Sequence, residues 1–136
     1  MKPCVFCDIV SGSVPAEIVW RDKDAIAFLD SRPLFPGHLL LIPTEHIGTL
    51  ADLPAAQVGP LFQTVQKLGN AVERALGAEG TFVGINNRVS QSVPHLHVHI
   101  VPRRKGDGLK GFFWPRRGYD SNDHLRETAD KIRREL

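Results

Sequence analysis

Residues 91–101 constrain the fold of this chain more than any other stretch, because they combine strand periodicity with three titratable side chains. They read QSVPHLHVHIV, in which histidines alternate with aliphatic residues. Successive side chains of a β-strand point to opposite faces, so the alternation predicts a strand with His95, His97 and His99 on one face and aliphatic side chains behind them. A row of imidazoles makes a poor core and a good reactive surface. The sequence therefore predicts a functional site on this strand.

Three interpretations of this strand compete. The histidines satisfy structural hydrogen bonds, or they bind a metal ion, since imidazole is a common zinc ligand. Ligands two residues apart on one flat strand need neighbouring strands to converge on the same ion, which weighs against a centre made of three imidazoles. In the third interpretation one imidazole is a nucleophile toward phosphorus, and its neighbours orient it or handle protons.

Residues 91–101 resemble the signature of the histidine triad (HIT) superfamily, His-x-His-x-His followed by apolar residues. Other motifs of the superfamily occur in the same order along the chain, and the resemblance covers roughly residues 4 to 105. These motifs are AFLD at 27–30, PGHLLLIP at 36–43, EHI at 45–47 and NN at 86–87. The ordered set is far more specific than the triad alone.

The resemblance implies an α+β protein with a HIT-like fold, in which one long helix packs on an antiparallel sheet of about five strands and a C-terminal helix is also present. Members typically pair into a homodimer with a continuous sheet, and we expect the same here. The chain has 136 residues, enough for one domain with a real core. We expect a single HIT domain over residues 1–136.

Local patterns predict the other strands of the sheet. Residues 17–20 and 25–29 are short apolar runs separated by the polar turn RDKD, which is typical of a β-hairpin. Residues 38–43 are almost entirely apolar, which predicts a strand buried on both faces in the middle of the sheet. Residues 81–86 precede an Asn-Asn turn and form a further strand.

The main helix is predicted over residues 52–77, where apolar side chains recur at spacings of three and four and Gly77 provides a stop. Pro60 is awkward inside a helix, so either the first turn begins near Gly59 or residues 52–58 form a separate turn. Two shorter helical segments are expected, at residues 6–10 and after the capping residues 121–123.

The two cysteines of the chain, Cys4 and Cys7, form a Cys-x-x-Cys pair. A redox pair, two inert buried thiols and half of a zinc site are all consistent with this spacing. Some HIT proteins complete such a pair with two histidines, and the matching positions here are His46 and His95. The resemblance therefore implies a structural zinc ion held by Cys4, Cys7, His46 and His95, with no metal required for the chemistry.

The resemblance also assigns a nucleotide site. Asp30 would hydrogen-bond the ribose hydroxyls, with turn capping as the alternative, and Phe6 and Phe28 would form walls around the base. Asn86 would contact the phosphate or its bridging oxygen, with a plain turn as the alternative. His38 would be a fourth histidine that orders the imidazoles, or else a satisfied polar group at a strand end.

Gln91 and Ser92 complete the predicted phosphate cradle, in which the Ser92 hydroxyl and backbone amides donate to phosphate oxygens. The superfamily usually has a glycine before the glutamine, whereas this chain has Ser90, after a connection shorter than expected. Because glycine lets backbone approach a phosphate closely, the serine bears on the geometry of the cradle.

By resemblance, His97 attacks the α-phosphorus of a nucleotide derivative and forms a nucleotidyl-histidine, which water hydrolyses to a nucleoside monophosphate. His99 contacts the phosphate and helps with protons, while His95 orients the strand or binds zinc. The transferase branch of the superfamily has glutamine at the position of His99, so the histidine favours hydrolysis. We expect a HIT-family nucleotide hydrolase whose substrate contains adenine.

Two substrate classes stay open, nucleoside phosphoramidates and dinucleoside polyphosphates, and the basic residues 103–107 resemble the branch that cleaves the latter. The basic and aromatic segment 103–117 either covers the nucleotide or is a solvated loop with an apolar anchor. A nucleotide-binding sensor with residual hydrolysis and a zinc-stabilised interaction module are the alternative functions.

Composition bounds the partners. The formal net charge of +2 at pH 7 gives no ground for nucleic-acid binding. No apolar run approaches the ~20 residues that span a bilayer, and the N-terminus lacks the charged-then-apolar pattern of a signal peptide. We therefore expect a cytoplasmic protein without a membrane or a specific nucleic acid as partner.

Overall fold

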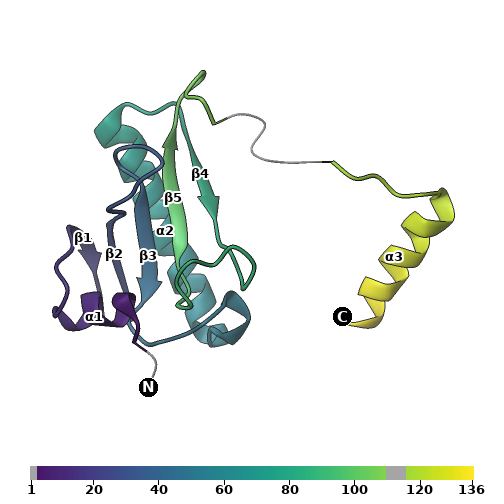
Figure 1. Cartoon of the computed structure of the whole chain (residues 1–136), viewed down its shortest axis with the longest axis horizontal. Helices are drawn as coiled ribbons and strands as arrows, with labels where there is room; N and C mark the ends of the chain where they lie inside the picture. Colours follow the sequence, from purple (N-terminus) through teal and green to yellow (C-terminus); the bar gives the residue numbers. More distant parts are fainter. Residues whose placement is uncertain (1–2, 110–115) are drawn as a thin grey trace.

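The structure is a computed structural model that describes residues 3–109 and 116–136. Its centre is a five-stranded antiparallel sheet with the strand order β1-β2-β3-β5-β4 (Figure 1). The strands are β1 Ile18–Arg21, β2 Ala25–Leu29, β3 Leu39–Pro43, β4 Gly80–Gly84 and β5 Val98–Arg103. The helices are α1 Val5–Ser11, α2 Ala55–Leu76 and α3 Asn122–Arg134, with a short 3-10 turn, η1 Leu50–Asp52. The predicted α+β class and the five-stranded antiparallel sheet are confirmed.

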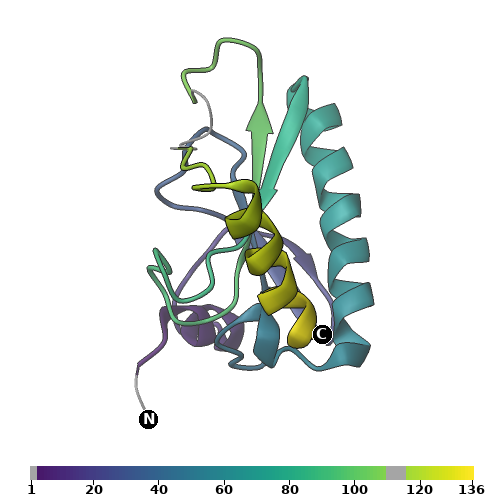
Figure 2. The same cartoon turned by 90° about the vertical axis from the view of Figure 1, so that its right-hand side faces the viewer.

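The two faces of the sheet have different coverings. Helix α2 lies along one face (Figures 1 and 2), where Ala27, Leu41 and Ile100 belong to the same core cluster as its apolar stripe. Helix α1 packs on the other face, where Phe6 joins the cluster that contains Phe28. Because α1 is short, it covers only part of this second face, and the functional side chains gather there.

The hairpin and the central strand form as predicted. Strands β1 and β2 pair in antiparallel register across the polar turn. Strand β3 occupies the middle of the sheet, between β2 and β5, and all five of its residues are buried. Burial on both faces explains its nearly uninterrupted apolar sequence.

Helix α2 begins earlier than either predicted alternative. Pro54 is the N-cap, and the helix continues through Pro60 to Leu76, so the predicted start near Gly59 and the predicted separate turn over 52–58 are both wrong. Proline at this position removes one backbone donor near the start of a long helix, a loss that the remaining length outweighs. The predicted stop is confirmed, since Gly77 adopts a left-handed conformation with φ of 60°.

The histidine segment is only partly a strand, because β5 begins at Val98. Upstream of it, the His95 amide donates to the Val93 carbonyl at 2.8 Å and the Leu96 amide to the Ile47 carbonyl at 2.6 Å. These residues bond to neighbouring loops in place of a sheet ladder. The prediction that His95 and His97 belong to the strand is therefore wrong, although His97 and His99 still face one cavity.

Helix α3 stands apart from the sheet and from α2 in Figure 1. It begins as predicted, with the Ser121 hydroxyl accepting from the His124 amide at 3.0 Å. None of its residues is buried, and Leu125 and Ile132 on its apolar stripe are 46% and 59% exposed. Among the described residues no helix is long and apolar enough to cross a bilayer.

Candidate active site and metal centre

Four predicted metal ligands converge at the N-terminus of α1. The ligand atoms of Cys4, Cys7, His46 and His95 all lie within 4.8 Å of one another. The His95 Nδ1 atom lies 3.4 Å from Cys4 Sγ and 3.6 Å from Cys7 Sγ, and His46 Nδ1 lies 3.3 Å from Cys7 Sγ. A sulfur and a nitrogen bound to one tetrahedral zinc ion lie roughly 3.6 Å apart, so this spacing fits such an ion.

The proton on His95 also fits a metal ligand. His95 Nε2 lies 2.9 Å from the Pro43 carbonyl oxygen, which can only accept, so Nε2 carries the proton and Nδ1 keeps its lone pair toward the two sulfurs. A ligating histidine commonly donates its other ring N–H to a carbonyl in this way. Burial lowers the pKa of His95, which favours the neutral ring that binds a metal.

The Cys7 thiol keeps its proton at neutral pH. Burial, followed by the hydrogen bond and charge of Cys4, raises the pKa of Cys7 to about 11. A zinc ion reverses this preference, because thiolates are its ligands and coordination releases the protons.

His97 has the opposite proton arrangement to His95. Its Nδ1 lies 2.7 Å from the His95 carbonyl oxygen, so Nδ1 donates and Nε2 keeps the lone pair. The ring is 3% exposed and lies edge-on against Phe6, with ring centroids 5.1 Å apart. An imidazole fixed in this tautomer presents Nε2 as a nucleophile.

His99, on β5, is oriented by the predicted fourth histidine. The Leu34 amide donates to His38 Nδ1 at 3.1 Å, so the proton of neutral His38 lies on Nε2. That atom is 3.0 Å from His99 Nδ1, which must accept, and His99 Nε2 is left as a donor. Burial, with smaller contributions from His97 and His38, lowers the pKa of His99 to about 4, so this chain of hydrogen bonds is neutral at pH 7.

Asp30, His38 and His99 form a second group whose ligand atoms lie within 4.8 Å of one another. This group does not fit a metal ion. The Leu34 amide holds the lone pair of His38 Nδ1, so His38 Nε2 carries a proton where a ligand needs a lone pair. The group is a hydrogen-bonded network instead.

A cavity of about 800 Å³ opens beside His97 and His99 on this face of the sheet. Phe6 and Phe28 form part of its wall, with ring centroids 5.5 Å apart, and Asp30 and Ser92 also line it. Asp30 Oδ1 accepts from the Arg32 amide at 2.9 Å, so this carboxylate caps a turn and lines the cavity at once. The apolar walls and the polar residues suit a nucleoside with its phosphate.

Comparison with known proteins places the chain in a family. The model of the HIT domain matches residues 11–106. This chain belongs to the HIT family. The solved structure of a HIT family member from Bacillus subtilis superimposes with a TM-score of 0.90 at 30% identity, over 99% of this chain and 98% of that one.

Two further relatives bear on chemistry. A histidine triad family protein from Mycobacterium smegmatis, described as Zn-bound, is 35% identical, with a TM-score of 0.74 over 98% of this chain and 97% of that one. The asymmetrical bis(5'-nucleosyl)-tetraphosphatase of Schizosaccharomyces pombe is 38% identical over 96 residues. That match covers 69% of this chain and 53% of the yeast protein, so the yeast enzyme is about twice as long as the shared part.

The loop before the triad shows how this HIT domain differs from the usual pattern. Ser90 has φ of 61° and Arg88 has φ of 69°, both in the left-handed region that favours glycine. The backbone conformation expected of a glycine is therefore kept with a serine at position 90. Both ends of the Gln91 amide are engaged, since Nε2 donates to the Gly48 carbonyl at 2.7 Å and Oε1 accepts from the Arg88 amide at 3.0 Å.

The polar residues of this loop, Asn86, Asn87 and Ser92, have different surroundings. Ser92 lines the cavity beside His97, and Asn86 lines a second cavity on the other side of His99. Asn87 Oδ1 accepts from the Leu50 amide at 2.9 Å and so anchors the loop. Contact of Asn86 and Gln91 with phosphate stays a prediction.

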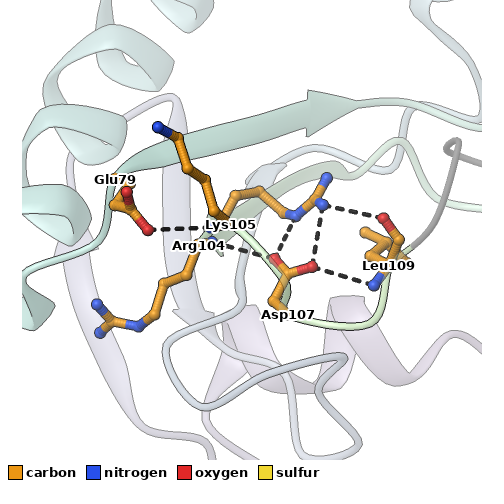
Figure 3. A network of polar contacts seen from close by, with 6 residues as sticks. Glu79, Arg104, Lys105, Asp107 and Leu109 are labelled. Carbon is orange, nitrogen blue, oxygen red and sulfur yellow. Dashed lines mark hydrogen bonds and ion pairs between the residues drawn. The ribbon is translucent and has the colours of Figure 1, made fainter.

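The basic residues after β5 are tied to their own loop (Figure 3). Arg103 forms two hydrogen bonds to the Asp107 carboxylate, whose pKa it holds well below its usual range. The Arg104 guanidinium donates to the Leu76 and Gly77 carbonyls at the end of α2. The Lys105 amide donates to Glu79 at 3.0 Å. These contacts support the loop interpretation for residues 103–109, whereas residues 110–115 of the predicted basic and aromatic segment lie outside the described residues.

The sequence did not identify the backbone groups that fix the protons: the Pro43 and His95 carbonyls and the Leu34 amide. They carry no residue-type signal, because any amino acid supplies the same carbonyl. Arg32 and Phe82, which line the cavities, were also missed. The position of Arg32 two residues after Asp30 is the one signal that could have found it.

Proposed function

We propose that this HIT protein is a nucleotide hydrolase that cleaves at the α-phosphate through a covalent nucleotidyl-His97. The observation that carries the proposal is the placement of protons: His97 has a bare Nε2 and its neighbour His99 has an Nε2–H, and both line one cavity. A lone pair beside a donor is what attack on a phosphoryl group needs. The yeast relative described above is named as a bis(5'-nucleosyl)-tetraphosphatase, an enzyme of nucleotide hydrolysis.

In the proposed reaction, His97 Nε2 forms a bond to the α-phosphorus while the bond from phosphorus to the leaving group breaks. His99 Nε2–H and the Ser92 hydroxyl donate to the phosphoryl oxygens and stabilise the charge that develops there. Water then attacks the phosphorus, the N–P bond breaks, and the nucleoside monophosphate leaves. The water proton passes to solvent, and His97 Nε2 regains its lone pair.

The remaining residues bind and orient. Phe6 and Phe28 pack around the base, for which we propose adenine, and Asp30 binds the ribose hydroxyls. His38 acts through His99 by fixing its tautomer. Asn86 and Gln91 complete the phosphate surroundings.

We also propose that Cys4, Cys7, His46 and His95 hold a structural zinc ion. Support comes from the spacing of the ligand atoms, from the tautomer of His95 and from the zinc reported for the mycobacterial relative. Bound zinc would supply a structural crosslink with no open position. The ion would hold His95, whose backbone carbonyl accepts from His97 Nδ1. It would also hold helix α1, whose Phe6 lines the cavity.

The assembly we propose is a homodimer in a reducing cytoplasm, which suits free thiols. Strand β4 is at an edge of the sheet, and its Val83 is 41% exposed, so two β4 strands are able to pair into a continuous sheet. The exposed apolar stripe of α3 would pack on the second copy. Light scattering coupled to gel filtration tests the assembly, and a monomer at micromolar concentration contradicts it.

The experiment that tests the function is intact-protein mass measurement after brief mixing with diadenosine tetraphosphate or adenosine phosphoramidate. Wild type should gain one adenylate and release AMP, and His97→Ala should gain none and lose activity by roughly 10⁴-fold or more. His124→Ala, at an exposed histidine on α3, is the matched control. Absence of adduct and product with both compounds contradicts hydrolysis, and retained AMP binding would then favour the sensor.

A further inference from the structure

The loop between β4 and β5 carries the polar residues proposed to surround the phosphate, Asn86 at its start and Gln91 and Ser92 near its end. Residues 86–90 between them are all exposed, and Val89 is 81% exposed. A segment with few buried apolar contacts opens easily, because little free energy holds it closed. The position of this loop therefore depends on its hydrogen bonds.

Two hydrogen bonds join the middle of the loop to another part of the chain. Asn87 Oδ1 accepts from the Leu50 amide at 2.9 Å, and Gln91 Nε2 donates to the Gly48 carbonyl at 2.7 Å. Gln91 Oε1 also accepts from a backbone amide of the loop itself, so the glutamine braces the loop internally. Asn87 adds a separate attachment, four residues earlier in the chain.

The partners of both hydrogen bonds belong to residues 46–50, a segment that is itself held firmly. Ile47 is buried in the core cluster that includes the apolar stripe of α2, and Thr49 is also buried. The Thr49 amide and hydroxyl both donate to the Asp52 carboxylate, at 3.2 and 2.8 Å, in a capping box. An exposed loop is thus tied to a buried support.

The Leu50 amide needs an acceptor from outside its own turn. Leu50 is the first residue of the 3-10 turn η1, and the first amides of a helical turn have no acceptor inside it. Asn87 supplies that acceptor from 37 residues further along the chain. The bond therefore satisfies a backbone donor at the same time as it fixes the loop.

Movement of the loop would displace the groups on either side of Asn87. Ser92 lines the cavity of the nucleophile, and Asn86 lines the second cavity, on the other side of His99. A donor stabilises the charge of a transition state only within roughly 3 Å of it, and a misplacement of about 1 Å costs up to about 100-fold in rate. Detachment of the loop should therefore reduce both phosphate affinity and rate.

We infer that Asn87 is a positioning residue, which holds the loop on residues 46–50 and acts through Ser92 and Asn86. Asn87 is not among the described residues that line either cavity, so its effect is indirect. The effect on turnover rests on the proposed hydrolase function, whereas the effect on binding of a nucleoside monophosphate does not.

The test compares Asn87→Ala with wild type in calorimetric binding of AMP and in turnover of adenosine phosphoramidate or diadenosine tetraphosphate, whichever the wild type cleaves faster. We expect AMP affinity to fall roughly 3- to 10-fold and kcat to fall roughly 10-fold. Asn87→Asp keeps an acceptor oxygen and should restore both to within about 3-fold in 0.5 M salt, where a Debye length of roughly 4 Å screens the added charge. Asn70→Ala is the matched control, because Asn70 is an exposed residue of α2 on the other face of the sheet.

Hydrogen exchange of the Leu50 amide tests the inference in the wild-type protein, without any variant. If the loop binds phosphate only while Asn87 holds it, bound AMP in turn stabilises that hydrogen bond, because coupling between two equilibria is reciprocal. Saturating AMP should therefore slow exchange of the Leu50 amide by at least about 3-fold.

Wild-type AMP affinity and kcat in folded Asn87→Ala overturn the inference, even if the Tm of the variant is lower, because that result shows a role in stability alone. Exchange of the Leu50 amide that AMP leaves unchanged overturns it as well. If the wild type cleaves neither nucleotide and Asn87→Ala still weakens AMP binding, the proposed hydrolase function fails and the positioning role stands.

Discussion

Two groups of side chains that each contain two histidines differ in where their protons lie. In the Cys4–Cys7–His46–His95 group, a backbone carbonyl accepts a hydrogen bond from His95 Nε2–H, and Nδ1 keeps its lone pair. In the Asp30–His38–His99 group, a backbone amide occupies His38 Nδ1 and forces the proton onto Nε2. The first arrangement suits a metal ion and the second a chain of hydrogen bonds.

The comparison teaches that backbone partners, more than residue type, decide what a buried histidine does. In both groups the potential ligand atoms lie within 4.8 Å of one another, yet the tautomers of the histidines differ. His97 lies between the groups and takes its own tautomer from the carbonyl of His95. The proposed zinc ion therefore acts on the nucleophile through one backbone carbonyl.

Loss of a ligand from the Cys4–Cys7–His46–His95 group should have the largest effect on zinc content and thermal stability. Cys4→Ser removes a buried ligand and should lower zinc from one ion per chain to almost none, with a Tm decrease of roughly 10 °C. Plasma emission spectrometry and calorimetry measure the two quantities. His38→Asn is the matched control from the Asp30–His38–His99 group. A similar loss of zinc in that variant would contradict the assignment of the metal to the Cys4–Cys7–His46–His95 group alone.

Loss of His38 should reduce catalysis without removing metal. His38→Asn takes away the donor to His99 Nδ1, which lets the His99 proton move to the wrong nitrogen. We expect kcat to fall roughly 10- to 100-fold with KM for the nucleotide nearly constant, because the partner of a functional imidazole typically contributes this much. Full activity in the variant would show that His99 needs no orientation.

Acid should destabilise the second group through His99. Because burial lowers its pKa from 6.5 to about 4, the unfolded chain binds more protons than the folded one between these pH values. The stability contribution is complete above pH 6.5 and is lost as the pH falls toward 4. Calorimetry of zinc-loaded protein at pH 7 and pH 5 should show a larger Tm decrease for wild type than for His99→Gln, and equal decreases would contradict the assignment.

The smallest effect is expected in the loop that leads to the triad. Ser90→Gly removes the strain of a left-handed serine, which should stabilise the folded state by about 1 kcal/mol. The greater conformational entropy of glycine in the unfolded chain offsets this gain by about 0.5–1 kcal/mol. The free energy of unfolding in urea should rise by about 0.5 kcal/mol or less. A decrease beyond about 1 kcal/mol would mean that the serine side chain itself stabilises the loop.

Much of the architecture and of the site membership was readable from sequence. The central position of strand β3 was predicted from its apolar sequence. The Cys-x-x-Cys spacing left three interpretations open, and the resemblance named His46 and His95, whose ligand atoms the structure brings together with those of Cys4 and Cys7. His38 was predicted to lie close to the triad, and its Nε2 atom lies 3.0 Å from His99 Nδ1. These features depend on residue type and periodicity, which a sequence records.

The remaining features depend on tertiary partners. Strand β5 starts at Val98 because the Leu96 amide bonds to Ile47, a contact that alternation of residues does not reveal. Gln91 has both ends of its amide on the protein backbone, with partners that no residue pattern in the sequence identifies. The tautomers depend on carbonyls and amides distant in sequence, so no pattern of side chains predicts them.

The most direct test of the account is the nitrogen-15 spectrum of the imidazole rings in zinc-loaded protein at pH 7, since protonated and bare ring nitrogens have distinct shifts. The account predicts a proton on Nδ1 of His97, protons on Nε2 of His38 and His99, and a metal-bound Nδ1 in His95. A His97 ring protonated at Nε2 would remove the nucleophile's lone pair and contradict the proposed mechanism.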